Sequence, residues 1–230
     1  MRRAADAREH GDAPMAMADL APYLDDLDRL NRWFGGHRLG SRAVLATLAP
    51  HDGRAAVVVD VGGARGDFAQ RLVRDARAAG RAIVAVVADR DEPSLVMGAR
   101  AAKDYPEIRW VQADATALPF RVASVDAAVT ALTMHHLEPD AAVQALREMR
   151  SIARLGVVVN DLLRSWASLA GVWLSTRLFA RHPSSRHDGP LSVRRAYAAS
   201  ELQALATRAG FRSFRVRRYW PLLRLIGMGT

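Results

Sequence analysis

The stretch VVVDVGGARGDF, residues 57–68, decides the fold of this chain. Three valines lead to Asp60, and glycines at 62, 63 and 66 end the apolar run before a helical pattern begins. A continuous β-branched run is typical of a strand that is covered on both faces. A strand that passes through a glycine turn into a helix indicates a parallel sheet, where ligands bind at the carboxyl ends of the strands.

The alternation of strand and helix patterns continues along the chain. Strand patterns occur at 56–61, 82–88, 108–112, 125–132 and 156–160, and helical patterns occur at 68–79, 93–103 and 139–152. A helix at 200–209 and two final strands within 211–220 and 222–228 complete the set. Together they predict an α/β fold with a doubly wound, mostly parallel seven-stranded sheet.

Three segments are added to this sheet. Residues 1–18 are polar and alanine-rich, and we predict that they are mobile. Leucines at helical spacing in 19–48, interrupted by two glycines, predict N-terminal helices that form a lid. Residues 163–198, an amphipathic stretch and then a polar one rich in Pro, Gly and Ser, are expected to form a helical insertion that caps the substrate side. Residues 19–230 then make a single domain.

Composition narrows the class of protein. The formal net charge is +9, but Lys103 is the only lysine among 33 basic residues, and the arginines are scattered without a nucleic-acid-binding motif, so we expect no nucleic-acid partner. The absence of cysteine excludes disulfides and thiolate chemistry. No apolar run approaches the ~20 residues of a membrane span. The charged N-terminus has no secretory pattern, and we expect a cytoplasmic location.

The glycine turn does not match the two common phosphate-binding patterns. Counted from Gly62, the third and sixth positions are Ala64 and Asp67, where a dinucleotide fingerprint requires glycine. The Gly-Lys-Ser/Thr end of a P-loop is missing as well.

The turn instead resembles the first motif of the class I methyltransferases that use S-adenosylmethionine, acid-x-Gly-x-Gly-x-Gly. Asp60, Gly62 and Gly66 match it, whereas Ala64 replaces the central glycine and Gly63 lies beside it. The resemblance implies that Asp60, Gly62, Gly63 and Gly66 bind S-adenosylmethionine, with S-adenosylhomocysteine as the product. Ala64 matters because glycine lets the backbone approach a cofactor closely.

Three further segments follow strands in the order that this family shows. A carboxylate after the second strand can accept hydrogen bonds from both ribose hydroxyls, and Asp89, followed by Arg90, has this place. VQADATALPF resembles the family's adenine-binding segment and implies that Asp114 and Ala115 bind the adenine. SVDAAVTALTMHHLE resembles the fourth-strand segment, which implies that Thr130 borders the methionine portion.

Transfer of a methyl group to a hydroxyl is helped by a base near neutral pH. His135 and His136 follow the fourth strand, and at most one of them is expected to face the site, because adjacent extended residues point in opposite directions. We favour His135, with His187 in the insertion and Asp161 after the fifth strand as further catalytic candidates. Residues 130–134 offer no acid for a metal site like that of catechol methyltransferases, so we expect no metal.

The substrate side is expected in the two added helical regions. Trp33 and Phe34 in the lid, and Trp166 and Arg186 in the insertion, predict a flat, largely apolar acceptor. The chain resembles ubiquinone/menaquinone-type and polyketide-modifying methyltransferases, which implies O-methylation of a small aromatic or polyketide-like acceptor. C-methylation of a quinone-like ring and a non-methylating role as a regulator or partner subunit are the alternatives. Both a monomer and a homodimer are open.

Overall fold

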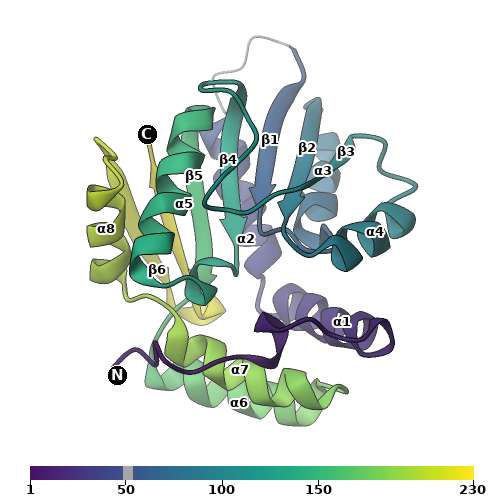
Figure 1. Cartoon of the computed structure of the whole chain (residues 1–230), viewed down its shortest axis with the longest axis vertical. Coiled ribbons are helices and arrows are strands. Elements are labelled where there is room, and N and C mark those ends of the chain that lie inside the picture. The colour runs from purple at the N-terminus through teal and green to yellow at the C-terminus, as the bar shows by residue number, and fades with distance from the viewer. Residues whose placement is uncertain (49–53) are drawn as a thin grey trace.

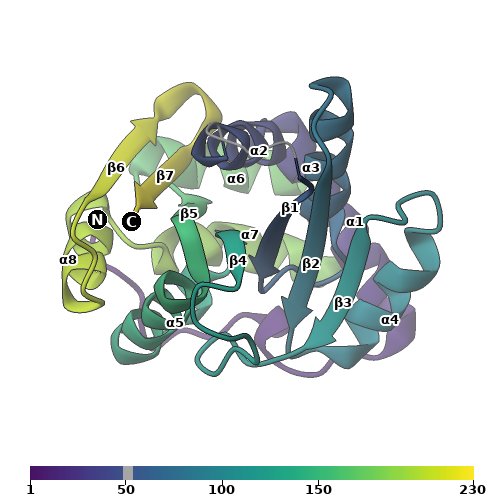
Figure 2. The same cartoon turned by 90° about the horizontal axis from the view of Figure 1, so that it is seen from above.

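A computed structural model describes residues 1–48 and 54–230. Its centre is a seven-stranded sheet of order β3-β2-β1-β4-β5-β7-β6, in which β7 alone runs against its neighbours (Figure 2). The strands are β1 Ala56–Val61, β2 Ile83–Asp89, β3 Ile108–Gln112, β4 Val125–Ala131, β5 Ala153–Leu162, β6 Phe214–Tyr219 and β7 Arg224–Gly229. The predicted mostly parallel, doubly wound sheet is confirmed, and the strand order reverses direction between β1 and β4.

Helices cover both faces of the sheet, as the continuous apolar strands require. The core on one face of the sheet contains Val59 and the buried side chains of α5 and α8. The core on the other face contains Val58 and the buried side chains of α2, α3 and α4. Successive residues of a strand point to opposite faces, so the valines of one strand contribute to the hydrophobic cores on both sides of the sheet. The helices are α1 Met17–Trp33, α2 Gly36–Thr47, α3 Asp67–Ala78, α4 Glu92–Ala101, α5 Pro139–Ile152, α6 Trp166–Phe179, α7 Pro183–Arg195 and α8 Ala199–Arg208, with short 3-10 turns η1 His10–Asp12, η2 Met134–His136 and η3 Trp220–Leu222.

A further layer lies across the carboxyl ends of the strands. It consists of α1, α6, α7 and the N-terminal segment, residues 1–16, which runs along α7 (Figure 1). The polar stretch rich in Pro, Gly and Ser forms α7, which Pro183 can begin because the first turn of a helix needs no donor from that residue. The added helices therefore cap the part of the sheet where ligands bind in this fold.

The N-terminal segment makes many contacts, although we predicted a mobile stretch over 1–18. The backbone N–H of Ala4 donates to the carbonyl of Arg194 at 3.0 Å, and the Arg3 side chain donates to the carbonyls of Arg195 and Leu137 at 2.7 and 3.0 Å. Glu9 is buried. The partners lie more than 130 positions away along the chain, so the local sequence gave no sign of them.

Candidate functional site

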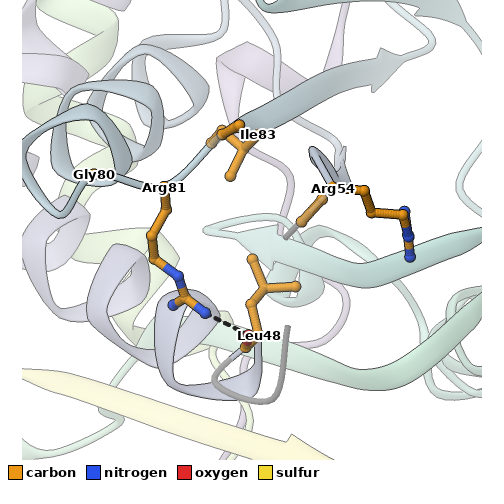
Figure 3. Close-up of a pocket in the computed structure, with 7 residues that line it drawn as sticks. Leu48, Arg54, Gly80, Arg81 and Ile83 are labelled. Atoms are coloured by element: carbon orange, nitrogen blue, oxygen red, sulfur yellow. Dashed lines mark hydrogen bonds between the residues drawn. The ribbon is translucent and has the colours of Figure 1, made fainter. Parts of the chain in front are cut away.

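A cavity of about 580 Å³ lies between the carboxyl ends of the central strands, the N-terminal segment and α1. Its walls include Gly11, Asp12, Tyr23, Asn31, His37, Asp60, Gly62, Gly63, Ala64, Asp89, Arg90, Asp114, Ala115, His136 and Asn160. A second hollow, of about 200 Å³, lies at the opposite end of the sheet, where Arg81 donates to the carbonyl of Leu48 and fastens α2 to the start of β2 (Figure 3). Only the first cavity meets the glycine turn.

The glycine turn packs closely against neighbouring side chains at positions where no other residue would fit. Gly62 and Gly66 have left-handed φ angles of 72° and 73°. A Cβ at Gly62 would lie 2.3 Å from the Thr133 methyl carbon, and one at Gly63 would lie 2.7 Å from a carboxylate oxygen of Asp60. Gly66 does not line the cavity. A Cβ at this position would lie 2.6 Å from the Trp110 ring, so a glycine is needed here for the start of α3 to pack against Trp110.

Ala64, at the central glycine position, also has a left-handed φ, of 45°. This conformation costs a residue with a side chain roughly 1–2 kcal/mol. The Ala64 methyl packs against the α1 cluster of Leu20, Tyr23 and Leu24, which offsets part of that cost. Its backbone N–H donates to Asp89 at 2.7 Å. The substitution therefore leaves the turn intact and joins it to α1.

Asp60 is a buried carboxylate without a partner. Neither of its oxygens has a hydrogen-bond partner among the described residues, although the side chain lies at the cavity wall and is 1% exposed. Burial, together with the charges of Asp89 and Asp67, raises the pKa of Asp60 to about 8. Such a group is costly to bury alone and favours a cationic ligand group beside it.

Asp89 and Asp114 occupy the two places expected of them along the sheet edge. Asp89 accepts from the N–H groups of Ala64 and Asp91 at 2.7 and 2.9 Å, which fixes the carboxylate at the cavity, while burial raises its pKa. Asp114 accepts at one oxygen from the hydroxyl and N–H of Thr116, and these bonds lower its pKa. Thr130 is different, because it is buried within β4 and does not line the cavity.

The two adjacent histidines have different surroundings. His135 is buried and does not line the cavity; its ring Nδ1 lies 2.7 Å from Oδ1 of Asp161, and its backbone N–H donates to Oδ2 of Asp161 at 3.0 Å. Burial alone would lower the pKa of His135, but the charge and hydrogen bond of Asp161 raise it. Burial would raise the pKa of Asp161, and His135 lowers it instead. This pair is a structural ion pair below the site.

His136 is the histidine at the cavity. Its Nδ1 lies 2.6 Å from Oδ1 of Asp12, and its Nε2 has no hydrogen-bond partner among the described residues. Burial alone would raise the pKa of Asp12, but hydrogen bonds from His136 and from the N–H of Glu9 lower it well below its usual value. Because an ionised carboxylate can only accept, Nδ1 is the donor to Asp12, and in the neutral imidazole this leaves Nε2 as an acceptor. Of the two histidines, His136 lines the cavity, whereas His135, which the sequence led us to favour, does not.

The other expected catalytic and substrate residues lie away from the cavity. His187 stacks on His10 at 4.3 Å between ring centroids and pairs with Asp188 at 2.8 Å. Trp33 packs edge-on against Phe179 at 4.3 Å, Trp166 is exposed, and Arg186 donates to the Ala180 carbonyl at 3.1 Å. None of these lines the cavity, nor does Phe34. Trp33 of α1 and Trp166 of α6 are exposed, whereas Tyr23 is the aromatic side chain of α1 that is buried and lines the cavity.

Residues that the sequence analysis missed form the opposite, polar end of the cavity. His37 bonds to Asp28 at 3.2 Å, and Asn160 donates to the Gly36 carbonyl at 3.0 Å, while its own buried carbonyl oxygen has no partner among the described residues. Asn31 accepts from the buried Arg224 at 2.5 Å. Asn31 and His37 lie in the region 19–48, where helical spacing predicts a helix but not which polar side chains face the cavity.

Two groups of side chains could supply metal ligands among the described residues, Glu9 with His135 and His136, and His10 with His187 and Asp188. Both are already engaged, since Glu9 pairs with Arg195 at 3.1 Å and Asp188 accepts from Tyr23 at 3.0 Å. The expectation of a site without metal stays a prediction. Within residues 1–48 and 54–230, no helix is long and apolar enough to cross a membrane.

A parallel sheet with a reversal beside an acid-bearing glycine turn defines the class I methyltransferase fold, and comparisons with known proteins agree. A family model described as "Methyltransferase domain" matches residues 58–156. Solved structures with the same fold include a SAM dependent methyltransferase from Aquifex aeolicus, with a TM-score of 0.59, 18% identity, and coverage of 82% of this chain and 88% of that one. The CurJ carbon methyltransferase has a TM-score of 0.61 at 13% identity, with 84% of this chain and 53% of that one covered.

Among curated proteins, the chain is similar to enzymes named ubiquinone/menaquinone biosynthesis C-methyltransferase UbiE. The one from Paracoccus denitrificans is 36% identical over 129 residues, which cover 54% of this chain and 49% of the relative. The one from Caulobacter sp. strain K31 is 33% identical, covering 53% and 48%. The chain thus spans about half the length of these relatives. Its residues 58–156, less than half of the chain, match the methyltransferase family model, and its fold is that of the class I S-adenosylmethionine-dependent methyltransferases.

The site fits the cofactor of this class. The unpartnered Asp60 suits an ammonium group, Asp89 suits ribose hydroxyls, and Gly62 and Gly63 of the glycine turn line the cavity between them. All three lie at the same cavity as the free Nε2 of His136.

Proposed function

We propose that the chain catalyses methyl transfer from S-adenosylmethionine to a small, largely apolar acceptor. The observation that carries the proposal is Asp60, a buried carboxylate with no partner among the described residues, in the same cavity as the anchored carboxylate of Asp89. A lone buried acid is destabilising unless a ligand supplies the counter-charge. When bound, the cofactor supplies a sulfonium-activated methyl group.

Each part of the cavity has a role in this proposal. Asp60 binds the amino group of the cofactor, Asp89 its ribose, and Asp114 with Ala115 its adenine. Asn31, His37 and Asn160, reinforced by the positive charge of Arg224 behind them, bind the carboxylate end. The apolar residues of α1 that line the cavity, Leu20, Leu24 and Leu27, exclude water and hold the acceptor.

His136 acts as the base. Asp12 holds the proton of the imidazole on Nδ1, so Nε2 accepts the proton of the acceptor hydroxyl as the hydroxyl oxygen gains the methyl group. This supports O-methylation of an aromatic or polyketide-like acceptor. C-methylation of a quinone-like ring is the second candidate, because the curated relatives bear that name and the same base could take the ring proton.

The test has two stages. Calorimetric titration with S-adenosylmethionine and S-adenosylhomocysteine, with NADH as the control, should show binding of the two sulfur nucleosides only. Turnover with phenols and quinols follows, with a labelled methyl group and mass spectrometric and NMR analysis of the methylated atom. Binding without turnover on any acceptor would favour the non-methylating role, and no binding would contradict the proposal as a whole.

A further inference from the structure

α6 is apolar on its outer face as well as on its inner one. Inside, Val172 packs with Leu162, Val193 and Ala196 against α7. The outer face, here called the α6 face, consists of Trp166, Trp173, Leu174, Leu178 and Phe179, which are 70, 50, 51, 63 and 43% exposed. A helix that is apolar all round is normally buried on all sides. In Figure 1, α6 lies at the lower edge of the molecule, with α7 between it and the sheet.

Trp33 of α1 extends the α6 face. Its ring is 55% exposed and packs edge-on against Phe179. Arg29 donates to the Phe179 carbonyl at 2.9 Å, and Asp26 accepts from the N–H groups of Arg181 and His182 at 2.8 Å. These bonds fix α6 to the helix that walls the cavity. Exposed apolar side chains gathered in this way on one helix and on the helix fixed to it indicate an interaction surface.

The segment that carries the α6 face has charges of one sign, although Arg164 in it is buried and paired with Glu201, and Asp26 of α1 lies at its end. Residues 162–187 contain four arginines, at 164, 177, 181 and 186, and no acidic residue. Arg177 lies over the Trp173 ring, with 5.7 Å from its guanidinium carbon to the ring centroid. Tryptophan and arginine together are typical of a helix that rests in the interface of an anionic membrane, with its apolar side chains among the acyl chains.

We propose that the α6 face binds the surface of an anionic lipid membrane. The 14 residues of α6 make a helix about 21 Å long, which is too short to cross a hydrocarbon core of ~30 Å, so α6 lies flat on the surface. The net charge of +9 adds long-range attraction to acidic headgroups. A second copy of this chain fits less well, since a symmetric contact would bring the same arginines face to face.

The proposal does not depend on the chemistry of the cavity. If it holds, α1 and the cavity that it walls stand close to the membrane surface, where an apolar small molecule concentrates. Membrane contact is measurable without any acceptor or cofactor.

The experiment is sedimentation of the full chain with vesicles of phosphatidylcholine, alone and mixed with phosphatidylglycerol. We expect binding to the mixed vesicles, weakened by salt, and an apparent affinity at least about tenfold lower for Leu178→Glu, equivalent to about 1.4 kcal/mol. Val122→Glu is the matched control, since Val122 is an exposed aliphatic residue just before β4, at the other end of the sheet, and should bind as the unchanged chain does.

Quenching of tryptophan fluorescence by brominated lipids tests the unchanged chain directly, and Trp173→Glu should reduce it. Circular dichroism should show both α6 variants folded, because the substituted side chains are exposed. Absence of vesicle binding by the unchanged chain would overturn the proposal, as would equal binding of Leu178→Glu. A dimer by light scattering that Leu178→Glu dissociates, without vesicle binding, would make a second copy the occupant and overturn it too.

Discussion

Asp60 lowers the stability of the ligand-free protein when its carboxyl group is ionised. Its pKa of about 8 in the folded chain lies above the unfolded value of 3.8, so the folded state holds a proton that the unfolded state releases. Between those two values the stability of the ligand-free protein falls as pH rises.

Asp60→Asn removes this penalty. We expect it to raise the free energy of unfolding at pH 8 by at least about 1 kcal/mol, or roughly 2–4 °C in Tm, and to flatten the fall of Tm from pH 4 to pH 8. The same change should weaken binding of S-adenosylmethionine. Thermal melts and calorimetry measure the two effects, with Asp114→Asn as a control that should not stabilise. An unchanged affinity would remove Asp60 from the cofactor site.

The two histidines should respond to substitution in opposite ways. His136→Gln removes the acceptor nitrogen at the cavity and should lower kcat about a hundredfold or more, with little effect on cofactor affinity or Tm. His135→Gln leaves Asp161 buried without its ion-pair partner, so it should mainly destabilise the fold, by about 3 kcal/mol. Kinetics and denaturant titration of both variants separate the roles. Equal turnover in His136→Gln would contradict the assignment of the base.

At the scale of elements, the N-terminal segment behaves as part of the domain. Glu9 pairs with Arg195, and both side chains are almost fully buried, whereas Glu138 pairs loosely with Arg3 at 3.7 Å and is 61% exposed. Glu9→Ala should therefore cost about 2 kcal/mol, because the buried Arg195 loses one of its two carboxylate partners and keeps only Asp12. Glu138→Ala should cost less than about 1 kcal/mol. Urea denaturation gives both values, and similar small losses would mean that the segment is detached in solution.

The elements differ in how far the sequence could predict them. The unit from β1 through the glycine turn to α3 was predictable, because valine runs, glycine positions and helical spacing are local signals. The pair of His136 and Asp12 was not, since 124 positions separate them and only the folded chain brings the two side chains together. The inward or outward direction of Trp33 and Trp166 depends equally on which helix packs beneath them.

At the scale of the whole molecule, cofactor binding should raise the free energy of unfolding. The cavity joins the sheet, α1 and the N-terminal segment, so a ligand there links all three. S-adenosylhomocysteine at a hundred times its Kd should add about 2.7 kcal/mol, which raises Tm by roughly 5–10 °C. Because Asp60 would ionise against the bound ammonium group, binding near pH 7 should also release a proton. Calorimetry in buffers of different ionisation enthalpy measures that proton, and identical heats would contradict it.

The division of the site between segments has an evolutionary consequence. The region that matches other methyltransferases, residues 58–156, carries the glycine turn, Asp89, Asp114 and His136, whereas Asp12, α1, α6 and α7 lie outside it. The residues proposed to bind the cofactor can then be inherited unchanged, while the segments proposed to bind the acceptor diverge. Paralogues with closely similar 58–156 regions should methylate different molecules, and chimeras that exchange residues 163–198 should carry any membrane preference with them.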